Sequence, residues 1–334
     1  MDRYVFAVND EVYCCWEYDL LERNERFLSS IDGEFFSYAA KQHLEHLEGE
    51  DAKRAALALR AGYHHGLETL FSLLGALCQA PEAVPAWIPK CNNGALRRLV
   101  ETLRHGGKVL TQVGPQHMSF NALAIIVHQY CWSDDQPTNA TADRFGRLWN
   151  RFAQDFLDPH CIAEYNSLKH GLRVSSGGFT LRIGEQESCG VPATEANMRT
   201  VGTSPYGTGF YEAVPVLTEG AAKHHIRIRR IALNWRAEAM VQRMQLIAWS
   251  INNVVAATRC LNGLAPDAVK FIRPEDPNMF EAAWQWRVGI LSSNFDVDID
   301  PSDVELVSKE DLRRELESRT LVSSGDSLLN SAER

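Results

Sequence analysis

Two long segments of this 334-residue chain repeat their apolar residues with the period of an α-helix, and they restrict its fold more than any other feature. The first runs from Asp51 to Gln79 and the second from Arg236 to Leu261. Apolar residues that return every three or four positions line one face of a helix, and that face must be buried. They are Leu59, Tyr63, Leu67, Leu70, Leu74 and Leu77 in the first segment, and Met240, Met244, Ile247, Ile251 and Val254 in the second. We therefore expect two long buried helices.

The remaining pattern divides the chain into three parts. Residues 1–30 have a mixed composition that assigns no structure to them, and residues 296–334 form an acidic tail that we expect to be partly disordered. Between them, residues 31–295 are predominantly helical, but the stretch 178–234 alternates apolar and polar residues as strands do. We therefore predict a mainly α fold, a helical bundle with a small inserted antiparallel β-element at about 178–234.

Two glycines in the first long segment carry a packing prediction. Gly62 and Gly66 lie one helical turn apart, and a glycine inside a helix costs about 1 kcal/mol relative to alanine. Close approach of a neighbouring helix would account for both of them.

Composition indicates a cytoplasmic protein. Hydrophobic residues make up 45% of the chain, but no apolar run is long enough to span a membrane. The first residues lack a basic region followed by an apolar one, so we expect no signal peptide. The eight cysteines include no C-x-x-C pair, which is typical of a reduced compartment and gives no support to a zinc site. We therefore predict no metal and no cofactor.

The negative charge is concentrated in the tail. The formal net charge is −9, and residues 296–334 hold eleven acidic residues against five basic ones. This distribution argues against broad coating of nucleic acid but leaves room for a local basic groove. The tail and the β-element are the two places where we expect a protein partner.

The stretch "DPHCIAEYNSLKHGLRV", residues 158–174, is the first candidate site. Asp158 followed by Pro159 is a strong helix start. On that helix Asn166, His170 and Arg173 share one edge, and Lys169 lies beside it. Histidine can transfer a proton near neutral pH, and arginine or lysine can hold a phosphate. The alternative is the solvated edge of a structural helix, where positive charge near the C-terminus is favourable.

The segment "YNSLKHG", after a series of amphipathic helices, resembles the terminal signature of HEPN-like proteins (higher eukaryote and prokaryote nucleotide-binding), a family of α-helical bundles. Many members are metal-independent ribonucleases of defence and toxin systems, and others are non-catalytic nucleotide-binding or scaffolding proteins. The resemblance implies that His170 is the catalytic histidine and Asn166 the adjacent polar residue. It also implies a homodimer. The family's arginine position holds Tyr165 here, so Arg173, Lys169 or Arg60 would have to supply the positive charge.

Further candidate ligand-binding residues lie elsewhere. Arg60 and His65 have the spacing of the family's Arg–His pair, but they lie in an early helix. In the basic strand "KHHIRIRRIALNW", alternation places Arg227 and Arg229 on one face, which could grip phosphates. Each group also has a structural interpretation: a chance pair of residues in one case and the solvated face of a sheet in the other.

The sequence leaves two functions open. The first is a HEPN-like protein that binds RNA or a nucleotide, and that cleaves RNA without metal if it is catalytic. The second is a non-catalytic helical scaffold that contacts a protein partner. Tyr165 at the arginine position favours the second.

Overall fold

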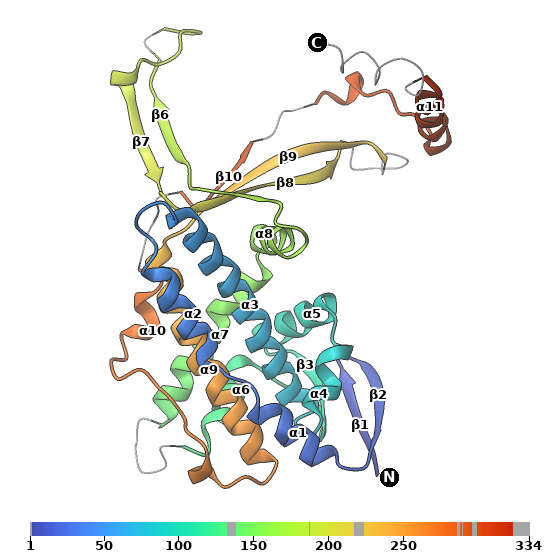
Figure 1. The fold of residues 1–334 in the computed structure, drawn as a ribbon, viewed down its shortest axis with the longest axis vertical. Helices are drawn as coiled ribbons and strands as arrows, with labels where there is room; N and C mark the ends of the chain where they lie inside the picture. Colours follow the sequence, from blue (N-terminus) through green and yellow to red (C-terminus); the bar gives the residue numbers. More distant parts are fainter. Residues whose placement is uncertain are drawn as a thin grey trace, which may run out of the picture.

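The computed structural model describes residues 2–131, 138–186, 188–216, 224–285, 288, 290–295 and 299–322. Figure 1 shows a helical body with long strands projecting from one end and helix α11 (Lys309–Val322) lying out beside them. One hydrophobic core runs through the body, from Phe6 near the N-terminus to Phe280. The part of the acidic tail at 323–334 lies outside the described residues.

Helices α3 (Ala52–Gln79) and α9 (Ala237–Leu261) form the centre of the body, and their two apolar faces are buried as the sequence predicts. Helix α2 (Glu34–Leu44) packs against both of them. A Cβ atom added at Gly62 would lie 2.8 Å from the terminal methyl of Met244, and one at Gly66 would lie 3.0 Å from Ile247 Cγ2. The two glycines therefore let side chains of α9 sit directly against the backbone of α3.

Residues 1–30, which the sequence left unassigned, join the core. Strands β1 (Asp2–Val8) and β2 (Glu11–Glu17) form an antiparallel hairpin, followed by helix α1 (Leu20–Ser29). Phe6, Val8 and Leu28 are buried. The indole N–H of Trp87 donates to the Ala7 carbonyl over 2.9 Å and ties the hairpin to the body.

The β-structure is larger than predicted. An antiparallel sheet with the order β10-β9-β8-β5 is built from β10 (Ser292–Phe295), β9 (Ile226–Asn234), β8 (Gly207–Pro215) and β5 (Val174–Ser176). Strands β6 (Thr180–Gly184) and β7 (Met198–Thr203) form a separate hairpin, which projects away from the body in Figure 1. The predicted strands within 178–234 are confirmed as β6, β8 and β9.

The prediction of a helical bundle with a small β-element is wrong, because the fold is mixed α/β. Two further hairpins lie outside residues 178–234: β1–β2 at the N-terminus and β3 (Lys108–Thr111) with β4 (Gly114–His117). Strand β10 also joins the main sheet from far along the chain. These strands are short, and four residues carry too little alternation to separate a strand from a loop. Their pairing partners make them strands.

The other elements complete the body. Helix α6 (Phe120–His128) follows shortly after β4. Helix α10 is short (Met279–Ala282). The remaining helices are α4 (Val84–Trp87), α5 (Asn93–Arg104), α7 (Thr138–Leu157) and α8 (Pro159–Lys169), with short 3₁₀ turns at Ile88–Lys90, Glu195–Asn197, Pro266–Ala268 and Pro301–Asp303.

Among the described helices, none combines the length and the apolar character that crossing a bilayer requires.

A candidate binding cavity where helices meet the sheet

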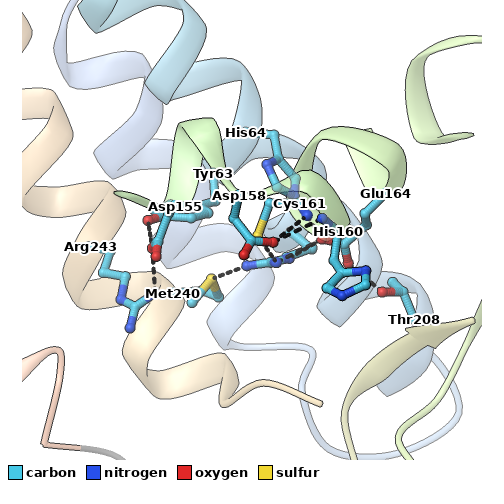
Figure 2. Close-up of polar contacts among 11 residues, drawn as sticks. Tyr63, His64, Asp155, Asp158, His160, Cys161, Glu164, Thr208, Met240 and Arg243 are labelled. Atoms are coloured by element: carbon cyan, nitrogen blue, oxygen red, sulfur yellow. Dashed lines mark hydrogen bonds and ion pairs between the residues drawn. The ribbon is translucent and has the colours of Figure 1, made fainter. Parts of the chain in front are cut away.

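A buried carboxylate, Glu164 of α8, lies where the helical body meets the sheet (Figure 2). Arg60 on α3 places Nε at 2.8 Å and Nη2 at 2.7 Å from Glu164 Oε2. His64, one turn further along α3, brings Nε2 to 2.8 Å from the same oxygen, and the hydroxyl of Thr208 on β8 donates to Oε1. One carboxylate thus joins α3, α8 and β8.

The protonation states of this cluster follow from its surroundings. Burial by itself would raise the pKa of Glu164, but the charge of Arg60 and the hydrogen bonds from His64 and Arg60 outweigh it and lower the pKa to about 2. Burial, and then the charge of Arg60, lower the pKa of His64. Glu164 is therefore ionised and His64 neutral at pH 7, so His64 donates its Nε2 hydrogen to Glu164.

Local sequence positions each member. Arg60, Tyr63 and His64 stand at i, i+3 and i+4 on α3 and so share one face. The carboxylate of Asp158 accepts from the backbone N–H groups of His160 and Cys161, both over 2.9 Å, and caps the N-terminus of α8 as the sequence predicts.

A second cluster adjoins the first. The Tyr63 hydroxyl donates to Asp155 Oδ2 over 2.5 Å, and Arg243 Nη1 on α9 donates to the same oxygen over 2.9 Å. The Arg243 guanidinium also lies over the ring of Trp284, 4.7 Å from its centroid. These contacts join α3, α7 and α9, and the ring of Trp284 lies against the guanidinium of Arg243.

A cavity of about 710 Å³ opens beside both clusters. Its polar and aromatic lining comprises Arg60, Asp155, Asp158, His160, Cys161, Trp235, Arg236, Arg243 and Trp284. Two N–H donors of this wall, Nε1 of Trp235 and Nε of Arg243, are buried and have no hydrogen-bond acceptor within the described part of the chain. A buried donor without an acceptor costs about 1–3 kcal/mol.

The residues predicted to form a site at 166–173 do not reach this cavity. His170 and Arg173 are exposed at the end of α8. Lys169 pairs with Glu68 over 3.0 Å. Asn166 is half-buried, and its carbonyl accepts the backbone N–H of His170. Helix α8 ends at Lys169, so His170 and Arg173 lie beyond it and do not share the predicted helix edge with Asn166. The four side chains do not line one common cleft.

The Arg60–His65 pair is separated by the helix itself. Five residues turn the chain by about 140° around the helix axis, so the two side chains point to different faces. Arg60 is buried on Glu164, whereas His65 is exposed and packs edge-on against the Phe36 ring, 5.5 Å between centroids. The histidine beside Arg60 is His64, four residues away.

Tyr165, at the family's arginine position, stays in the polar edge. Its hydroxyl donates to Glu68 over 2.6 Å, and its ring stacks on His64 with 5.2 Å between centroids. Tyr165 therefore reaches the Glu164 cluster through the His64 ring.

Strand β9 alternates as predicted, but two of its isoleucines face solvent and its two predicted arginines lie on the more buried face. Arg227 and Arg229 are half-buried, and Arg229 pairs with Glu212 of β8 over 2.9 Å. Ile226 and Ile228 are instead exposed, to 57% and 71%. Neither arginine lines the cavity.

The residue that sequence reasoning missed is Glu164. On a helix it shares a face with Cys161, three positions before it, and with Leu168, four positions after it. A carboxylate inside a buried stripe must have a cationic partner. Arg60 and His64 on a neighbouring buried helix were the available partners, and this was the signal that could have found it.

No group of three or more histidine, cysteine or acidic side chains suited to a metal ion occurs among the residues whose structure is described. Comparisons of the chain with protein-family models, with curated proteins and with solved structures find no match. The HEPN-like resemblance therefore stays a prediction.

Proposed function

We propose that this protein binds a nucleotide in the cavity between α7, α8, β9 and α9. The observation that carries the proposal is the pair of unpartnered donors on the cavity wall, Trp235 Nε1 and Arg243 Nε. Both atoms are covered by the protein, so a small turn of the two side chains toward an acceptor-rich ligand would offset the cost of leaving them unpaired. The proposal keeps the ligand class that the sequence predicts and moves the site away from His170.

The charges and rings of the cavity suit a phosphate attached to an aromatic base. Arg243 of α9 and Arg236, which directly precedes α9, line the cavity together with Arg60 of α3, whose guanidinium is already held by Glu164. A guanidinium can donate two parallel hydrogen bonds to two oxygens of one phosphate. Trp235 and Trp284 supply flat surfaces, and base stacking on an aromatic ring is worth about 1–3 kcal/mol. A volume of about 710 Å³ lies within the usual range for small-molecule sites and accommodates a single nucleotide.

Binding of the nucleotide, without cleavage of RNA, is the form of the function that we propose, because its support comes from the rings and arginines of the cavity. Cleavage by 2′-hydroxyl attack needs a histidine that can exchange a proton beside the phosphate. His64 is neutral and holds Glu164, and His65 and His170 lie outside the cavity, so cleavage would have to rest on His160, the histidine among the lining residues. A cytoplasmic location, where nucleotides are abundant, belongs to the same proposal.

The experiment is isothermal titration with AMP, GMP, CMP, UMP and ribose 5-phosphate. We expect the nucleotides to bind at least about tenfold more tightly than ribose 5-phosphate, because only they can stack. Trp235→Phe keeps a ring but removes the N–H, and should weaken nucleotide binding by about three- to tenfold.

Trp87→Phe is the matched control. The Trp87 N–H is already bonded to Ala7, so this variant should melt earlier but bind nucleotide normally. If none of the five probes binds, or if Trp235→Phe and Trp87→Phe bind alike, the proposal fails.

A second candidate function rests on a different surface. Tyr211, Ile226 and Ile228 expose apolar side chains on one face of the β8–β9 ribbon, which projects from the body (Figure 1). An exposed apolar face of this kind is typical of protein–protein contacts and favours an interaction module. Ile228→Ser should leave nucleotide titrations unchanged, so the two functions can be separated by which variant alters which activity.

A further inference from the structure

A groove of about 750 Å³ lies on the other side of α3 and α8 from the nucleotide cavity. Helices α2, α3 and α8 form its walls, and the lining is mainly apolar: Phe35, Phe36, Leu57, Ala58, Leu168 and Leu172. A concave apolar surface with a few polar groups at its margin is the usual form of a small-molecule site.

Leu172, which lines the groove, has a strained backbone. It follows α8 with a φ of 51°, in the left-handed region that glycine adopts readily and leucine rarely. Its side chain is 65% exposed, so burial does not compensate for the strain. Backbone strain that persists without a packing reason concentrates at ligand-binding sites.

The charged side chains at the margin of the groove indicate which class of ligand it binds. Arg54 and Lys169 line the groove, and the carboxylate beside them, Glu68, is already held by Lys169 and by the Tyr165 hydroxyl. Within the described residues Arg54 pairs only with Asp51, three positions earlier at the exposed start of α3, and exchanging that partner is easy. Burial lowers the pKa of His43, which is therefore neutral and adds a polar but uncharged group.

We propose that this groove binds a free long-chain fatty carboxylate, with the acyl chain along the apolar wall and the carboxylate on Arg54. The apolar lining buries the methylene groups, and a guanidinium binds a carboxylate through two parallel hydrogen bonds. This site shares no lining residue with the nucleotide cavity and does not depend on the proposed function.

The test is displacement of the fluorescent fatty acid cis-parinarate from the full chain by oleate and by oleyl alcohol, below their aggregation concentrations. Arg54→Gln should lower the affinity for oleate about tenfold and leave that for oleyl alcohol unchanged. Lys53→Gln removes the adjacent charge on the same helix, outside the groove, and should change neither affinity.

Leu172→Gly separates a binding role from a structural one. Glycine relieves the left-handed strain, so the melting temperature should hold or rise, while both oleate and oleyl alcohol should bind several-fold more weakly. The proposal is overturned if oleate does not displace cis-parinarate, if Leu172→Gly binds as the wild type does, or if the protein sediments with oleate-containing vesicles without removing oleate from them.

Discussion

The inward and outward sides of helix α8 carry similar residue types with opposite consequences. On the inward side Glu164 is fully buried and meets Arg60, His64 and Thr208 (Figure 2). On the outward edge, by which we mean the stretch from Lys169 to Arg173 at and just past the end of α8, His170 and Arg173 are exposed to solvent. The two sides are only a few residues apart in the sequence.

Residue spacing on a helix therefore shows which side chains share an edge, but it does not show how much those side chains contribute to stability. A charge pair in water contributes about 0–1 kcal/mol, because solvent screens it and side-chain entropy opposes it. The same pair inside the protein interacts more strongly and is costly to break, because neither partner can return to water. The predictions below test this contrast, beginning with the largest expected effect.

Glu164→Ala should lower the free energy of unfolding by about 3–5 kcal/mol, because it leaves the Arg60 charge buried without a counter-ion. Glu68→Ala removes a carboxylate of α3 that pairs with Lys169 at the outward edge. This change should lower the free energy of unfolding by only about 1 kcal/mol. Urea denaturation of both variants measures the difference. Equal losses in the free energy of unfolding would show that the Glu164 cluster contributes no more to stability than the Glu68 pair.

Acid should destabilise the protein through the same carboxylate. The folded pKa of Glu164, about 2, lies below its ordinary value of 4.5, so between those pH values the unfolded chain binds a proton that the folded chain does not. The stability from Glu164 is complete above pH 4.5 and is lost as the pH falls toward 2, by about 3 kcal/mol in all. Burial also lowers the pKa of His64, and lowers that of His128 to about 4, so destabilisation begins near pH 6.5.

Urea midpoints measured from pH 7 to pH 3 would follow this loss. Glu164→Gln should flatten the part of the curve below pH 4.5 and leave the His128 part between pH 6.5 and 4 in place. A wild type and a Glu164→Gln variant with parallel curves below pH 4.5 would contradict the assignment of that step to Glu164.

The smallest effects belong to the outward edge. His170→Ala and Arg173→Ala should each change the free energy of unfolding by less than about 0.5 kcal/mol, because both side chains are exposed. Incubation of a mixed RNA pool in EDTA should give the same result for both variants as for the wild type. Cleavage by the wild type that disappears in His170→Ala, with an unchanged melting temperature, would instead place the working site on the outward edge.

Local physics determined a large part of this protein. The periodicity of 51–79 and 236–261 specified α3 and α9, since a repeating apolar face permits only a buried helix. Asp158 and Pro159 specified the start of α8, because a cap acts on the next two or three residues only. Alternation within 178–234 specified β6, β8 and β9. Each of these signals is complete within one short window of the chain.

The site and the extent of the sheets were decided by tertiary structure. Arg60 and Glu164 are 104 residues apart, and Thr208 lies 44 residues beyond Glu164, so no window of the sequence contains the cluster. Strand β10 is a strand because β9 lies beside it, and four residues hold no periodicity of their own. Which side of α8 became the buried one depended on where α3 and β8 packed, because both sides carry polar residues. That choice placed Glu164 inside and left His170 in solvent.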